Sequence, residues 1–175
     1  INNTNLVIFS ILIKNSQFNL KLIQKYKNMS NQETIKNLIQ NAENYLKTKK
    51  FLTFTIQEPD YDNALHCYKN AAHLLKIEKE WIKSAEYYCE VAKIYRIQKS
   101  YLQEAYEYLD AADLFKRGEQ KYNYEFYYEK AINIFIERGD YYKASSLRKK
   151  LAEEEEDENP SNYNRIIQKY KEAIT

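Results

Sequence analysis

Residues 80–95 read EWIKSAEYYCEVAKIY, and this stretch decides the fold. It begins beside a Trp, carries two adjacent tyrosines at its centre, and places Ala85 and Ala92 seven residues apart. Residues three, four and seven positions apart share one face of an α-helix, so Tyr88 lies between the two alanines on that face. Two interpretations fit the pattern: a local site centred on Cys89, or one unit of a repeat.

The rest of the chain shows the same pattern at intervals of 20 residues. The repeated tyrosines are Tyr68, Tyr88, Tyr108 and Tyr128. The residues four positions after them are small or apolar, namely Ala72, Ala92, Ala112 and Ile132. Aromatic residues recur in the turn regions at a similar interval, as Trp81, Tyr101, Tyr122 and Tyr141. The stretch is therefore one unit of a repeat, and repeats of this length are typical of solenoid proteins.

Each unit predicts one helix of about 15 residues followed by a short turn. Alanines on the shared face let the next helix approach closely, and turns this short require neighbouring helices to be antiparallel. We expect an all-α fold, a TPR-like right-handed α-solenoid in which antiparallel helical hairpins stack into a twisted sheet. The expected helices cover residues 31–50, 60–77, 81–97, 101–117, 121–138, 141–156 and 162–174.

Composition agrees with a helical fold and narrows the classes of partner. The chain of 175 residues contains only two glycines and two prolines, whereas β-rich folds need many Gly and Pro turns. Its net charge is +2, and residues 1–28 alone carry four lysines and no acid, so the remainder is slightly acidic. This charge does not predict a nucleic-acid partner. Two cysteines are too few for a disulfide scaffold and suit a reducing compartment.

The first 28 residues differ in composition from the units that follow. They are rich in Asn, Ile and Lys, and their apolar run over residues 6–13 is too short to span a bilayer. The segment that follows from residue 29 resembles a natural protein start. It contains a helix-capping pattern, in which Ser30 precedes Glu33 by three residues. We expect residues 1–28 to be an extension outside the repeat domain of residues 29–175; the alternative is an extra amphipathic helix near residues 15–27.

Ordered motifs from residue 29 onward resemble a known family. AENYLKTKKFLTF, EPDYDNALHCYKNAAHLLKIEKEW, KSAEYYCEVAKIY and EAYEYLDAADLFKR occur in the order found in the soluble NSF attachment proteins, the SNAP family. The resemblance covers residues 29–175, about the N-terminal half of a family member. The PDYD motif at residues 59–62 is similar to the gamma branch.

The resemblance implies an adaptor in vesicle trafficking and membrane fusion. Such proteins lay a concave, charged face against the SNARE four-helix bundle and recruit the hexameric ATPase NSF. The main NSF contact is expected beyond Thr175, and the adaptor has no chemistry of its own. The protein would be cytoplasmic and peripherally attached to membranes. A different interpretation remains open, namely a generic TPR-like scaffold that binds a helical or extended peptide outside the fusion machinery.

A short loop between the first two predicted helices is the most specific candidate for a local functional site. Its alternating apolar residues could tuck under the first hairpin. In the SNAP family the matching loop dips into the membrane, which suits apolar side chains next to cations. The predicted membrane-contact residues are Phe51, Leu52, Phe54, Ile56, Lys49 and Lys50.

Basic residues at helix ends are the second candidate set. Most such residues are solvated charges favoured by the helix dipole, but some match family lysines near the SNARE-facing surface. The SNARE-binding candidates are Lys79, Lys99, Lys116, Arg117, Arg138 and Lys143. Asp140 and Ser146 replace basic residues of the alpha branch, which favours a gamma-like protein. The acidic run at residues 153–158 is interpreted as a frayed helix end and a solvated loop.

Catalytic and metal-binding patterns are missing from the sequence. Two histidines and two cysteines are present, but none form the paired, closely spaced ligands of a zinc site. The sequence contains no phosphate-binding Gly-rich loop, nucleophile elbow or HExxH motif. We therefore expect no catalytic residue, no metal and no cofactor.

Overall fold

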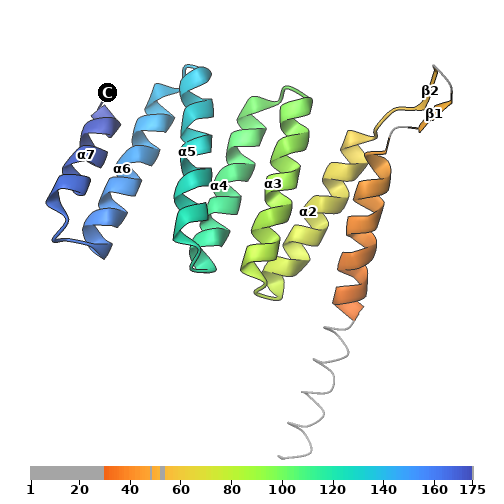
Figure 1. Ribbon diagram of the computed structural model, residues 1–175, viewed down its shortest axis with the longest axis horizontal. Helices are drawn as coiled ribbons and strands as arrows, with labels where there is room; N and C mark the ends of the chain where they lie inside the picture. Colours follow the sequence, from red (N-terminus) through yellow and green to blue (C-terminus); the bar gives the residue numbers. More distant parts are fainter. Residues whose placement is uncertain (1–29, 48, 52–53, 175) are drawn as a thin grey trace, which may run out of the picture.

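The computed structural model describes residues 30–47, 49–51 and 54–174, apart from some side chains in the hairpin and at the C-terminal end. A first helix covers residues 30–45. A hairpin of β1 (Lys49–Phe51) and β2 (Phe54–Gln57) follows it. Figure 1 shows the remaining helices side by side in one row, each antiparallel to the next. They are α2 (Tyr61–Ile77), α3 (Trp81–Ile97), α4 (Tyr101–Arg117), α5 (Lys121–Glu137), α6 (Tyr141–Glu158) and α7 (Tyr163–Ile174). The predicted all-α repeat of helical hairpins is confirmed.

The period of 20 residues has a simple structural basis. Each of the helices α2 to α5 contains 17 residues, and three residues separate each of them from the next helix. The predicted bounds agree with the observed ones to within two residues from α2 onward. The predicted acidic loop is wrong, because α6 continues to Glu158 and the acidic run is helical.

The first predicted helix was too long at its C-terminal end. The helix ends at residue 45 rather than 50, and the expected loop is an antiparallel β-hairpin. Phe51 pairs with Phe54 and Lys50 with Thr55, and a register shift lies between Lys49 and Lys50. Aromatic and β-branched residues favour a strand over a helix, which explains why the helical pattern stops here. Leu52 lies outside the described residues.

The four turns from α2 to α6 share one hydrogen-bonding pattern. At the first, the Glu80 amide donates to the Leu75 carbonyl at 2.9 Å and the Lys79 amide to the Lys76 carbonyl at 3.1 Å. The same pair of bonds closes the other three turns, which makes each a Schellman motif. This motif requires one residue in the left-handed region, and those residues are Lys79, Lys99, Glu119 and Gly139, with φ of 62°, 58°, 59° and 78°.

The last residue of each turn also begins the next helix. Asp140 shows this most clearly, because its carboxylate accepts a hydrogen bond from the Lys143 amide at 3.0 Å. Asp60 caps α2 in the same way, through the Asn63 amide at 3.1 Å, and these hydrogen bonds lower the pKa of the Asp60 carboxyl. The acid at position 140 therefore has a structural role as an N-cap.

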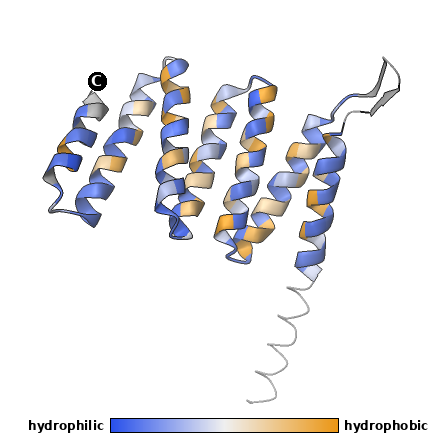
Figure 2. Ribbon diagram, in the orientation of Figure 1, coloured by the Kyte–Doolittle hydropathy of each residue, from blue (hydrophilic) through white to orange (hydrophobic). Residues whose placement is uncertain are grey.

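The core consists of small and aromatic residues shared between neighbouring helices. The buried alanines include Ala72, Ala92 and Ala112, which are fully inaccessible, and the repeated Tyr68, Tyr108 and Tyr128 fill the space beside them. Cys89 packs in the same cluster as Ala85 and Ala92. Figure 2 shows apolar stripes along α3, α4 and α5, whereas α6 and α7 are largely hydrophilic. The central helices therefore carry most of the hydrophobic core.

Glycine and lysine substitutions at the left-handed turn positions should change stability in opposite directions. Gly139→Ala is expected to lower the free energy of unfolding by about 1 kcal/mol, because a Cβ is disfavoured at positive φ. Nothing lies within 4 Å of the added Cβ, so the effect is purely conformational. Lys99→Gly should raise stability by roughly 0.5 kcal/mol. Urea denaturation followed by circular dichroism measures both.

A Lys→Gly change inside a helix serves as the control for this prediction. Lys76 lies in the last turn of α2, where Gly should cost roughly 1 kcal/mol. A loss of stability in Lys99→Gly as large as that in Lys76→Gly would contradict the left-handed turn.

Candidate interaction site

The six predicted SNARE-binding residues lie at two opposite edges of the helical row. Figure 1 places the α2–α3 and α4–α5 turns along one edge, here the lower edge, and the α3–α4 and α5–α6 turns along the other, the upper edge. The lower edge carries Lys79, Lys116 and Arg117, and the upper edge carries Lys99, Arg138 and Lys143. The structure therefore does not bring the six together in one cluster.

Four of the six contact aromatic rings of other helices. Arg117 lies 5.6 Å from the ring centre of Trp81, and Arg138 lies 4.2 Å from that of Tyr101. The two pairs are equivalent, since each joins the end of one helix to the first residue of the helix before it. These cation–π contacts stabilise the packing and hold the guanidinium groups in fixed positions.

The other two ring contacts are made by lysines. One of these lysines is also ion-paired, and the other lies farther from its ring. Lys116 lies 5.1 Å from the ring centre of Tyr124 and its Nζ lies 2.9 Å from the Glu154 carboxylate. Lys143 lies 5.8 Å from the ring centre of Tyr106. Lys79 and Lys99 differ from these residues, because both are exposed at left-handed turn positions. Neither of the two has a ring contact or an ion pair among the described residues.

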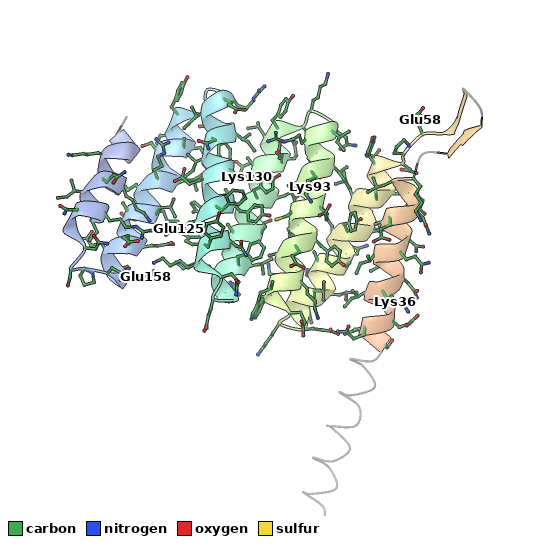
Figure 3. All side chains as sticks on the ribbon, in the orientation of Figure 1. Lys36, Glu58, Lys93, Glu125, Lys130 and Glu158 are labelled. Atoms are coloured by element: carbon green, nitrogen blue, oxygen red, sulfur yellow. The ribbon has the colours of Figure 1, made fainter. Side chains whose placement is uncertain are left out.

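Two lysines between the edges were missed by the sequence interpretation. Figure 3 shows Lys93 and Lys130 in the middle of the row, away from both edges. The Lys130 ammonium lies 4.7 to 5.4 Å from the ring centres of Phe126, Tyr127 and Tyr108. Lys93 is paired with Glu90 at 2.5 Å, whereas Lys130 has no ion pair with a carboxylate of the described residues. This cation is thus held in place by rings and is still available to an anionic partner.

A sequence signal for Lys130 existed but was incomplete. Phe126 and Tyr127 precede it by four and three residues, so they share its side of α5. The third ring, Tyr108, comes from the previous helix and becomes visible only when the packing is known. The predicted binding residues were chosen only among the basic residues at helix ends, so basic residues in the middle of a helix were not considered.

Two acidic side chains of α4 are buried and paired with bases from other helices. Glu104 is fully buried, and its Oε1 accepts a hydrogen bond from the Arg96 Nε at 2.6 Å, whereas its Oε2 lacks a partner among the described residues. Glu107 pairs with Lys69 of α2 at 2.5 Å. Burial raises the pKa of the Glu107 carboxyl, and the Lys69 hydrogen bond opposes that shift. The first pair joins the successive helices α3 and α4, and the second joins α2 to α4. The charges of both acids are therefore already paired within the protein.

A denser ionic network joins α5, α6 and α7. Its centre is the buried Glu155 carboxylate, which lies 3.3 Å from Arg165 Nε, 3.5 Å from Lys169 Nζ and 3.9 Å from Lys121 Nζ. Glu125 of α5 pairs with Arg165 at 2.8 Å. Because α6 and α7 have little apolar surface, charge pairing contributes more to this end of the row than to the centre.

The described residues show no arrangement for nucleophilic or metal chemistry. Burial raises the pKa of the Cys89 thiol to about 11, so the sulfur is protonated at neutral pH and is a poor nucleophile. In the described part of the chain, no three His, Cys, Asp or Glu side chains gather to hold a metal. None of the helices in that part combines the length and hydropathy that crossing a bilayer would require.

One apolar groove is open to solvent between the first helix and α3. It encloses about 220 Å³, with Ile35, Ile39, Leu75 and Tyr87 among its lining residues. Lys36 and Lys83 line it as well. The hairpin side chains of the predicted membrane contact lie outside the described ones, so only their backbone pairing is known.

The fold and these surfaces define an α-helical repeat protein whose exposed features are charges, rings and a shallow groove. The sequence profile described as "Soluble NSF attachment protein, SNAP" matches residues 33–175, and the chain belongs to this family. This finding confirms the family suggested by the motifs. A search of curated proteins found no significant match.

Among solved structures, the chain is similar to the crystal structure of BtubC (BKLC) from P. vanneervenii. The two are 20% identical, with a TM-score of 0.49 over 67% of this chain. The chain spans 47% of the length of that protein.

Removing the base from the Arg96–Glu104 pair should destabilise the protein more than the substitution of an exposed side chain usually does. Arg96→Met is expected to cost roughly 2 kcal/mol, because it leaves a buried carboxylate unpaired. Adding Glu104→Gln should recover part of the loss by removing the charge. The control is Lys93→Met, whose partner Glu90 is exposed and should cost under about 0.5 kcal/mol. Equal losses in thermal unfolding for Arg96→Met and Lys93→Met would refute the assignment.

Proposed function

We propose that the chain is the repeat portion of an adaptor that binds SNARE complexes and recruits the NSF ATPase for SNARE disassembly. The observation that carries this proposal is the family match over residues 33–175, together with a helical row that presents fixed cations. The adaptor has no chemistry of its own. The chain is assigned to the gamma-like branch.

The SNARE contact is proposed to centre on the face between the two edges. A four-helix bundle laid across α3 and α5 would meet Lys93 and the ring-held Lys130, with Lys79 and Lys99 at its flanks. Such basic patches mainly raise the association rate and make binding sensitive to salt. Arg117, Arg138, Lys116 and Lys143 contribute less to this contact, because they lie at the edges and their ring contacts hold them there, away from the face that carries Lys130.

The hairpin is proposed to contact a membrane surface. Its backbone pairs Phe51 with Phe54 directly beside the turn, which puts two aromatic positions at the tip, followed by Ile56 and preceded by Lys49 and Lys50. Apolar residues at a tip flanked by lysines suit an interfacial contact. The protein would then be a cytoplasmic, peripherally bound membrane protein, with residues 29–175 as its repeat domain and residues 1–28 as an extension.

A scaffold for an unrelated peptide is the second candidate function. The apolar groove between the first helix and α3 favours it, since a groove of about 220 Å³ with two lysines could take apolar side chains of an acidic peptide. This function would not need SNARE complexes or NSF.

Charge reversal on the central face tests the SNARE contact. The double variant Lys93→Glu and Lys130→Glu is expected to weaken binding to a SNARE complex at least tenfold at low salt, measured by fluorescence anisotropy. Lys36→Glu, at the groove, is the matched control and should leave binding unchanged. No binding of the parent chain, or loss in the control alone, would favour the scaffold.

Hairpin substitutions test the membrane contact separately. Phe51→Ser with Phe54→Ser should reduce co-sedimentation with liposomes that contain anionic lipid, because the aromatic tip no longer enters the interface. SNARE binding in solution should not change. Liposome binding equal to that of the parent chain would end the proposal for the hairpin.

A further inference from the structure

Large apolar side chains are exposed along the upper edge. Tyr141 and Tyr142 are 67% and 88% exposed at the start of α6, and Ile97 and Leu102 flank the α3–α4 turn. The counterparts of Tyr141 in α3 and α4 are better covered. Trp81 and Tyr101 occupy the same helix position as Tyr141, and each is stacked beneath an arginine. Tyr141 is therefore more exposed than its counterparts in α3 and α4, and with Tyr142 it forms a pair of exposed tyrosines on the upper edge.

The hairpin lies on this same edge. Figure 1 shows β1 and β2 at one end of the upper edge and the α5–α6 turn further along it, with the α3–α4 turn between them. A flat surface that touches the hairpin can thus also approach the two turns. The lower edge lies at the opposite ends of the same helices and cannot reach that surface.

We propose that the upper edge is a second membrane contact, which lies on the bilayer interface beside the hairpin. This inference rests on the proposed membrane contact of the hairpin and extends it to Tyr141, Tyr142, Ile97 and Leu102. Tyrosine combines an apolar ring with a hydroxyl that hydrogen-bonds at the headgroup level, which suits the interface between lipid and water.

Cations at the upper edge fit the same surface. Lys99 is exposed at its turn, while Arg138 and Lys143 lie over Tyr101 and Tyr106. Lysine and arginine side chains at an interface can extend toward lipid headgroups. The edge thereby gives a role to Arg138 and Lys143, two predicted SNARE-binding residues that contribute little to the central face.

Charge alone does not drive this contact. Glu137 and Asp140 share the α5–α6 turn with Arg138 and Lys143, so the net charge of the turn is close to zero. Asp140 is also held by its role as the cap of α6. The contact therefore depends mainly on the tyrosines, and it should weaken little when salt rises, unlike a polybasic contact.

The lower edge supplies a matched control within the same protein. Tyr122 and Phe126 are 79% and 43% exposed near the start of α5, one unit before the α6 tyrosines. They stack on each other at 6.2 Å between ring centres. The two edges thus expose similar aromatic pairs and differ in their position relative to the hairpin.

Liposome binding by three double variants of the full chain tests the proposal. The vesicles contain phosphatidylcholine with about one third phosphatidylserine, and binding is measured by co-sedimentation at low and high salt. Tyr141→Ser with Tyr142→Ser is expected to weaken binding about tenfold at both salt concentrations. Tyr122→Ser with Phe126→Ser is expected to bind as the parent does. Circular dichroism confirms that each variant is folded.

The hairpin variant Phe51→Ser with Phe54→Ser separates this inference from the proposed function. Loss of binding in the hairpin and α6 variants, with the α5 variant unchanged, supports the upper edge. Loss in the hairpin variant alone overturns the upper edge and leaves the hairpin contact standing. Equal loss in the α5 and α6 variants overturns the edge preference, and unchanged binding in every variant overturns both contacts.

Discussion

The close approach of neighbouring helices at buried alanines is the contact on which the rest of the structure depends. Ala72, Ala92 and Ala112 are fully inaccessible, so each helix lies directly against the next, and the repeated tyrosines fill the space that remains. A larger side chain at these positions would separate the helices and expose the rings. The left-handed turn residues are tolerated for the same reason, since packing on both sides of the turn outweighs a backbone penalty of about 1 kcal/mol.

The helical part of this fold could be predicted from the sequence because its signals are local and repeated. The period of 20 residues sets both helix length and turn length, and each unit repeats the evidence of the last. The β-hairpin was not predicted, since its short strands interrupt the helical pattern only once and no repeat reinforces their signal. The end of α6 was misjudged because consecutive acids suggest a solvated loop. Glu155 is nevertheless buried among bases of α5 and α7, which no local pattern shows.

The candidate site was only partly predictable for a related reason. Six basic residues were identified at helix ends, but a period of one helix places successive turns at alternate edges, so the set divides in two. Whether a cation is available depends on which ring or carboxylate lies beside it, and those partners come from other helices. Arg138 and Lys130 both contact rings, yet the first stands at an edge and the second on the open face between edges.

This separation of surfaces follows from the geometry of a single row of helices. Seventeen residues make a helix of about 25 Å, so contacts made by one edge leave the opposite edge and the intervening face free. If the upper edge rests on a membrane, the helices stand roughly perpendicular to the bilayer. Lys93 and Lys130 then face sideways, toward partners near that membrane. Membrane attachment and partner binding would then use different residues of the same helices, and each could be altered without the other.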